Sequence, residues 1–161
     1  MTDIETRLAQ LEDRITLLED HNAILRLMYA YGPAVDSGSA ETVAQLWTED
    51  GVYDVDTGRL DGREQIASMV RSDAHQRWIN RGCGHIISPA HITVTGDTAV
   101  ATCHTQVILK RQSHDGYSVG RVTANRWEFA RTDDGWQVTT RTNRLLDGRS
   151  EARELLAAGV V

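Results

Sequence analysis

The stretch Leu25-Arg-Leu-Met-Tyr-Ala-Tyr-Gly-Pro-Ala-Val-Asp36 puts a carboxylate and two phenols at the end of an apolar helix. An ionised aspartate in apolar surroundings needs a charged or hydrogen-bonding partner, because otherwise its pKa rises until it becomes neutral. Asp36 therefore either meets a polar group from elsewhere in the chain or caps the next helix, at Ser37-Gly-Ser-Ala-Glu41. Pro33 cannot donate to the carbonyl of Tyr29, so we expect a kink or break near Gly32-Pro33.

Upstream of this helix end, apolar residues recur with alternating steps of four and three, which predicts a helix with a heptad seam. The seam positions are Ile4, Leu8, Leu11, Ile15, Leu18, Asn22 and Leu25. A narrow seam with an asparagine at a core-type position indicates packing on another subunit, and the alternative is a helix lying across its own domain. Towards Asp36 the pattern widens into the stripe of a helix buried in a globular core. That stripe consists of Ile24, Leu27, Met28, Tyr31 and Val35.

Downstream, two more helices and then a series of strands are expected. Ser39 is a candidate cap for a second helix, which has Val43, Leu46 and Trp47 on its apolar face and ends at Asp50-Gly51. A short strand at 52–55 and a third helix from about Arg63 to Trp78 follow. Turn residues between β-branched runs predict hairpin-linked antiparallel strands at 85–87, 91–95, 99–110, 117–131 and 136–145, then a tail helix from Glu151 to Ala158. Helices followed by such a meander make an α+β domain.

Length and composition limit the classes of function. The 161 residues, 40% of them hydrophobic, predict a single domain over 1–161, with the heptad helix at 1–24 and a tail at 150–161. No apolar run approaches the ~20 residues of a membrane span, and the chain begins with no leader, so we expect a cytoplasmic protein without membrane contact. A net charge of −6 without a basic stripe predicts no nucleic-acid partner. Cys83 and Cys103 lack paired spacing and are interpreted as small buried hydrophobes.

The sequence has no glycine-rich phosphate loop, no zinc-protease motif and no nucleophile elbow, so any chemistry must come from ordinary side chains. Strand alternation puts Asn125, Trp127 and Phe129 on one face, and the buried amide needs a polar partner. His85 follows a glycine and precedes two isoleucines, which indicates a ring entering the interior from a rim. A metal site built from His85, His91 and His104 is disfavoured, because no carboxylate or cysteine stands at a ligand-like spacing.

Taken together, this order of elements and polar residues resembles the SnoaL-like branch of the nuclear transport factor 2-like superfamily, from Leu8 to Leu145. The resemblance implies a cone-shaped, curved antiparallel sheet wrapped by N-terminal helices around a deep pocket. It is closest to cofactor-free lyases such as bile acid 7α-dehydratase and scytalone dehydratase. It implies catalytic roles for Asp36, His85 and Tyr31, and pocket positions for Tyr53 and Asn125.

The chain also departs from these relatives. Bile acid dehydratase has a further aspartate on the strand that here reads Cys103-His-Thr-Gln-Val107, where His104 is the only titratable residue. A halide-eliminating relative has a lysine where this chain has Tyr31, which argues against halide loss. The full set of expected substrate-binding residues is Tyr53, Asn125, His104, Trp127 and Phe129.

An Asp–His pair has a physical logic that does not depend on the family. A buried carboxylate fixes the imidazole tautomer and leaves the other ring nitrogen as a base. The sequence therefore predicts a cofactor-independent lyase, most simply a dehydratase, acting on an apolar cyclic substrate of steroid or polyketide type. The alternatives are an isomerase or polyketide cyclase with the same dyad, a binding module, and a structural subunit. The heptad seam predicts a homodimer or homotrimer.

Overall fold

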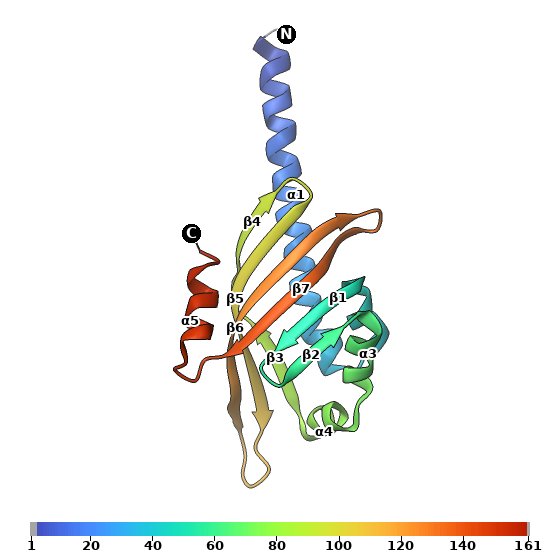
Figure 1. Cartoon of the computed structure of the whole chain (residues 1–161), viewed down its shortest axis with the longest axis vertical. Coiled ribbons are helices and arrows are strands. Elements are labelled where there is room, and N and C mark those ends of the chain that lie inside the picture. The colour runs from blue at the N-terminus through green and yellow to red at the C-terminus, as the bar shows by residue number, and fades with distance from the viewer. Residues whose placement is uncertain (1–2, 161) are drawn as a thin grey trace.

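The computed structural model describes residues 3–160 and has the expected α+β architecture, with helices packed on a curved, unclosed sheet (Figure 1). The helices are α1 (Asp3–Asp36), α2 (Ala40–Gln45), α3 (Arg63–Arg71), α4 (Asp73–Arg81) and α5 (Ser150–Ala157). The strands are β1 (Trp47–Val55), β2 (Gly58–Asp61), β3 (Cys83–Ile87), β4 (His91–Thr95), β5 (Thr98–Lys110), β6 (Tyr117–Thr132) and β7 (Gly135–Leu145). None of the helices in the described range is long and apolar enough to cross a membrane.

The sheet has the order β2-β1-β7-β6-β5-β3, and β4 pairs with β5. All pairs are antiparallel except that of β1 with β7. On β5, Ala101 and Cys103 point into the core, whereas Thr102 between them points to the other face. Gly159, just after α5, packs against the side chain of Thr102, so the C-terminal helix covers the outer face of the sheet.

The break expected near Gly32-Pro33 does not occur. Helix α1 continues through these residues to Asp36. The ring of Pro33 lies on the exposed side of the last turns, where the missing hydrogen bond is the main cost. Gly32 allows two backbones to pack closely at this point. A Cβ added to it would lie 2.6 Å from the carbonyl oxygen of His85, so its lack of a side chain lets α1 approach β3 closely.

Two other helix boundaries also differ from the expectation. Helix α2 ends at Gln45, and Trp47 begins β1 instead of closing a longer helix, although Val43, Leu46 and Trp47 are buried as expected. Ser39 makes no side-chain capping bond. The single helix expected over 63–78 is divided at Ser72, whose hydroxyl accepts a hydrogen bond from the backbone N–H of His75. Serine at such a position caps the following helix, which is why the chain bends there.

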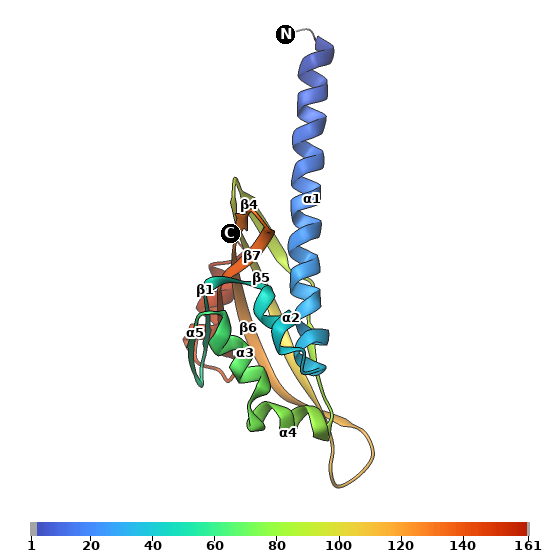
Figure 2. The same ribbon diagram turned by 90° about the vertical axis from the view of Figure 1, so that its right-hand side faces the viewer.

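The N-terminal half of α1 projects beyond the rest of the molecule (Figure 2). The seam residues Ile4, Leu8, Leu11, Ile15 and Leu18 are 51–69% exposed. The helix therefore does not lie across its own domain. The broad stripe begins at Ile24, and Ile24, Met28, Tyr31 and Val35 are buried as expected.

Candidate active site

The end of α1 and the start of β3 meet in a hydrogen-bonded pair. His85 Nδ1 lies 2.6 Å from Asp36 Oδ1, and the backbone N–H of His85 donates to Asp36 Oδ2 at 2.7 Å. The predicted contact between the two residues is thus confirmed. Burial alone would raise the pKa of Asp36, but the hydrogen bonds from the ring and backbone of His85 outweigh it and hold this pKa below its ordinary value.

This geometry fixes the tautomer of the His85 imidazole. A carboxylate only accepts, so Nδ1 must carry the hydrogen and donate it. Nε2 is then the nitrogen with a free lone pair, and it makes no hydrogen bond within residues 3–160. His85 lines a cavity of about 450 Å³, whereas Asp36 stands behind it and holds it in place.

The cavity wall is largely apolar, and its phenols come from two elements. Tyr31 of α1 and Tyr53 of β1 both line it, and the Tyr31 ring lies edge-on to the His85 ring with centroids 6.2 Å apart. Burial, followed by the neighbouring Tyr53 phenol, raises the pKa of Tyr31 well above its ordinary value. Tyr31 therefore stays protonated, and its phenol lies next to that of Tyr53 in the cavity wall.

Arg141 of β7 was not predicted from the sequence and is the fully buried arginine of this cavity. It is only 1% exposed, and its Nε and Nη2 donate to Asn125 Oδ1 at 3.0 and 2.8 Å. Its guanidinium carbon lies 4.0 Å from the Trp127 ring and 4.3 Å from the Tyr31 ring, within cation–π range. No carboxylate within residues 3–160 pairs with it, and its Nη1 is buried without a hydrogen bond.

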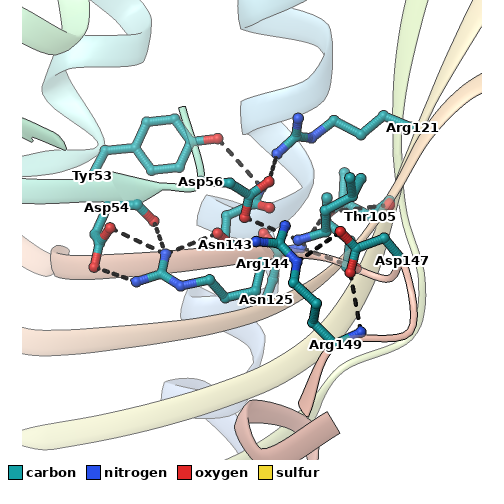
Figure 3. A network of polar contacts seen from close by, with 12 residues as sticks. Tyr53, Asp54, Asp56, Thr105, Arg121, Asn125, Asn143, Arg144, Asp147 and Arg149 are labelled. Carbon is teal, nitrogen blue, oxygen red and sulfur yellow. Dashed lines mark hydrogen bonds and ion pairs between the residues drawn. The ribbon is translucent and has the colours of Figure 1, made fainter. Parts of the chain in front are cut away.

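The other arginines that line the cavity are neutralised. Arg59 pairs with Asp61 at 2.8 Å, and Arg121 pairs with Asp56 (Figure 3). Arg141 is therefore the lining arginine whose charge is left for a bound molecule.

Two further lining residues have unused hydrogen-bonding atoms. Asn143 donates to the Tyr53 hydroxyl at 3.4 Å, as Figure 3 shows, while its Oδ1 is buried and unpaired. Thr105 Oγ1 is also buried without a partner. Unpaired buried polar atoms are costly, so a cavity that collects them favours a polar group on its ligand.

His75 of α4 is a second histidine on the cavity wall that sequence reasoning did not single out. Its Nε2 lies 3.0 Å from the carbonyl oxygen of Val35, and its ring lies 6.2 Å from that of His85. A carbonyl accepts, so Nε2 of His75 carries the hydrogen and Nδ1 is its free nitrogen. The Ser72 cap, which positions α4, was the available sequence signal for this placement.

Four of the expected substrate-binding residues lie outside the cavity lining. Asn125 is completely buried behind Arg141, and Trp127 and Phe129 are stacked in the core beside it. His104 is exposed on the outer face of β5, because strand alternation turns Thr105 inward in its place. Of the expected set, Tyr53 lines the cavity, together with the expected catalytic residues Tyr31 and His85.

Possible metal ligands gather in one place within residues 3–160, at Asp36, Cys83 and His85. His91 and His104 do not join this group, since His91 is exposed and faces the carbonyl of Gly159. Burial and then the charge of Asp36 raise the pKa of the Cys83 thiol to about 11, and the thiol donates to Asp36 Oδ1. A metal needs the thiolate, so these residues fit a hydrogen-bonded cluster better than a metal site.

A curved, mostly antiparallel sheet with helices packed on it is the architecture of the nuclear transport factor 2-like class of small α+β proteins. Residues 16–142 match the SnoaL-like domain, and the chain belongs to this family, as the resemblance implied. No protein with a curated description matches the sequence.

Solved structures agree with this assignment. A nuclear transport factor 2-like protein with a cystatin-like fold from Novosphingobium aromaticivorans is 43% identical, with a TM-score of 0.89, and the match covers 92% of this chain and 96% of that one. A protein of unknown function from Mycobacterium tuberculosis is 23% identical, with a TM-score of 0.72 and coverage of 92% and 90%. A protein from Catenulispora acidiphila, solved in complex with S-DNPA, is 22% identical, with a TM-score of 0.67 and coverage of 81% and 94%.

Proposed function

We propose that this protein is a cofactor-independent lyase, a dehydratase, in which His85 is the general base and Asp36 its positioning residue. The observation that carries the proposal is the pair of hydrogen bonds that Asp36 accepts from the ring and the backbone N–H of His85, whose ring lines the cavity. A base fixed in one tautomer, beside a cation and a phenol, suits removal of a proton next to a carbonyl.

In the proposed reaction, His85 Nε2 takes the proton from the carbon between a carbonyl and a hydroxyl-bearing carbon. The electron pair of the broken C–H bond moves onto the carbonyl oxygen, and this enolate is stabilised by Arg141 Nη1 and the Tyr31 O–H. The enolate then re-forms the carbonyl and expels the hydroxyl group. The imidazolium returns its proton to the departing oxygen, so the products are an unsaturated carbonyl compound and water.

The cavity supports a mostly apolar, cyclic substrate. A volume of about 450 Å³ falls within the ~300–1,000 Å³ of small-molecule sites. Apolar walls come from Val55, Leu60, Met69 and Val107, and polar atoms gather near Arg141, Thr105 and Asn143. A substrate of steroid or polyketide type, with a polar group at one end, matches this distribution.

An isomerase or polyketide cyclase is the second candidate function. The SnoaL-like family includes polyketide cyclases and isomerases, and the same base would shift a double bond or close a ring without losing water. Product mass separates the two candidates. A dehydratase product is lighter than its substrate by one water molecule, whereas an isomerase product has the same mass.

The proposal is tested by substitution once a cyclic hydroxy ketone is turned over. We expect His85→Ala to lower turnover by about 10²–10⁴-fold. Adding Asp36→Asn should then cost little more, because residues that act as one unit are not additive. Substrate affinity should change far less than turnover, since the proton moves in the transition state.

His104→Ala is the matched control, because this histidine is exposed on the outer face of β5. It should leave turnover unchanged. A His85→Ala variant that kept more than about a tenth of wild-type turnover would make His85 a packing residue. A pure binding module would show no turnover and an affinity that follows Tyr53 and Arg141.

A further inference from the structure

The projecting half of α1 carries an apolar surface that nothing within the described chain covers. In a heptad written abcdefg, Leu8, Ile15 and Asn22 fall at a, and Ile4, Leu11, Leu18 and Leu25 fall at d. This part of the helix has 17 residues and is about 25 Å long, and a helix of this length is only marginally stable in water without packing on another element. A contiguous row of exposed apolar side chains is also uncommon on a monomeric protein.

The seam also faces away from its own domain. Asp20 is at an f position, opposite the a and d positions, and it contacts the domain. Arg131 Nη2 and Trp136 Nε1 donate to its carboxylate at 2.7 and 2.9 Å. The a and d positions are thereby turned outward, where a second helix can approach without meeting the sheet.

The charges beside the seam are self-complementary in one orientation. The e positions hold Glu12 and Glu19, and the g positions hold Arg7 and Arg14. In a parallel pair, each g residue meets the e residue five positions later on the partner, so Arg7 meets Glu12 and Arg14 meets Glu19, whereas His21 meets Arg26 at the end nearest the domain. In an antiparallel pair, g meets g and e meets e, so like charges meet. All four side chains are exposed and make no ion pair within residues 3–160.

We propose that this face binds a second copy of the same chain as a parallel, in-register, two-stranded coiled coil. Asn22 at an a position favours a dimer over a trimer and fixes the register, and leucine at most d positions agrees with two strands. The domains then lie on the outer sides of the helix pair, since each is attached through the f side. The two cavities remain separate, so this assembly does not depend on the proposed chemistry.

The first test is the mass of the full chain in solution, measured by light scattering at micromolar concentration. The wild type should show twice the 17.9 kDa of one chain. The double variant Leu11→Asp with Leu18→Asp should be a monomer. The control, Ala9→Asp with Thr16→Asp, adds the same charge at b positions and should stay a dimer. A wild-type monomer or trimer, or a dimer that survives the seam variant, would overturn the proposal.

The second test distinguishes parallel from antiparallel pairing. Leu18→Cys should form a disulfide-linked dimer under mild oxidation, because in-register helices place the same residue opposite itself, whereas Thr16→Cys should not. Arg7→Glu with Arg14→Glu should raise the dimer dissociation constant about tenfold or more, since the pairs with Glu12 and Glu19 become repulsive. An antiparallel dimer would give no Leu18 cross-link and an unchanged dissociation constant. Tryptophan near-ultraviolet dichroism should match the wild type in every variant, because the seam is outside the core.

Discussion

Arg141 is held in the core by an amide and aromatic rings, and no carboxylate of residues 3–160 forms an ion pair with it. Burial of a cation without an anion is unfavourable, so its retention makes sense if a ligand supplies negative charge. Asn125→Asp would place a carboxylate at the oxygen that Arg141 already contacts. We expect this variant to keep or raise the melting temperature, and to lower turnover by about 10-fold or more because the enolate loses the free positive charge.

The control for this prediction is Asn125→Ala, which removes the contact without adding charge. It should lower both the melting temperature and turnover, because Arg141 loses its main support. Full turnover in Asn125→Asp, with Arg141 shown by a structure to be paired, would remove Arg141 from the mechanism.

At this scale the sequence predicted His85 as the partner of Asp36, but it did not predict the Cys83 thiol beside Asp36 or the buried Arg141. On β7, Trp136 and Val138 point inward, and simple alternation would next turn Thr140 inward and Arg141 outward. A bulge interrupts the pairing, since Glu128 pairs with Thr140 but Phe129 pairs with Val138. One extra residue exchanges the two faces of a strand, and no sequence pattern here marks it.

Among the elements, the contact between α1 and β3 sets the distance of the Asp36–His85 pair. Gly32→Ala should raise helix propensity by about 1 kcal/mol, but its Cβ would meet the His85 carbonyl at 2.6 Å. Because that oxygen belongs to the backbone, the helix and strand must move apart. We expect a net loss of about 1–3 kcal/mol in unfolding free energy and a lower turnover.

Gly84→Ala is the matched control, since it adds the same methyl group next to His85 where no atom lies within 4 Å. Denaturant unfolding of both variants measures the difference. A Gly32→Ala protein as stable and active as the wild type would show that the close packing of α1 on β3 does not position the pair.

Most elements could be predicted because their signals are local. Heptad spacing, strand alternation and Asx-Gly turns indicated α1 and β3–β7 to within a few residues. The division of α3 from α4 was missed, because the helical pattern continues across Ser72 and only the cap marks the bend. The path of α1 through Pro33 depends on tertiary packing, which overrides the local preference of proline.

For the molecule as a whole, Asp20 connects the long helix to the sheet through hydrogen bonds. It is 7% exposed and binds Arg131 of β6 and Trp136 of β7, and Arg131 also lies over the Trp136 ring. The hydrogen bond from Arg131 is the main reason that the pKa of Asp20 lies below its ordinary value, against the opposing effect of burial. The folded state therefore binds the Asp20 proton more weakly than the unfolded chain does.

The sign of the pH dependence follows from this difference. A lowered carboxyl pKa contributes stability that is complete above the unfolded value, near pH 4, and is lost as the pH falls towards the folded value. Asp20→Asn should thus lower the unfolding free energy by about 1–3 kcal/mol at pH 7. The gap to the wild type should narrow as the pH falls from about 4 towards the lower folded pKa, because the Asp20 carboxylate takes up a proton over this range.

Urea unfolding of the full chain at pH 7 and pH 3, followed by tryptophan fluorescence, measures that gap. Asp13→Asn is the control, because Asp13 lies at the f position one heptad earlier and is exposed, so it should behave like the wild type at both values. A gap for Asp20→Asn that is equal at both pH values would mean that the carboxylate acts through its shape and not through its charge. In that case Trp136, which donates to either an amide or a carboxylate oxygen, would be the contact that anchors α1 to the sheet.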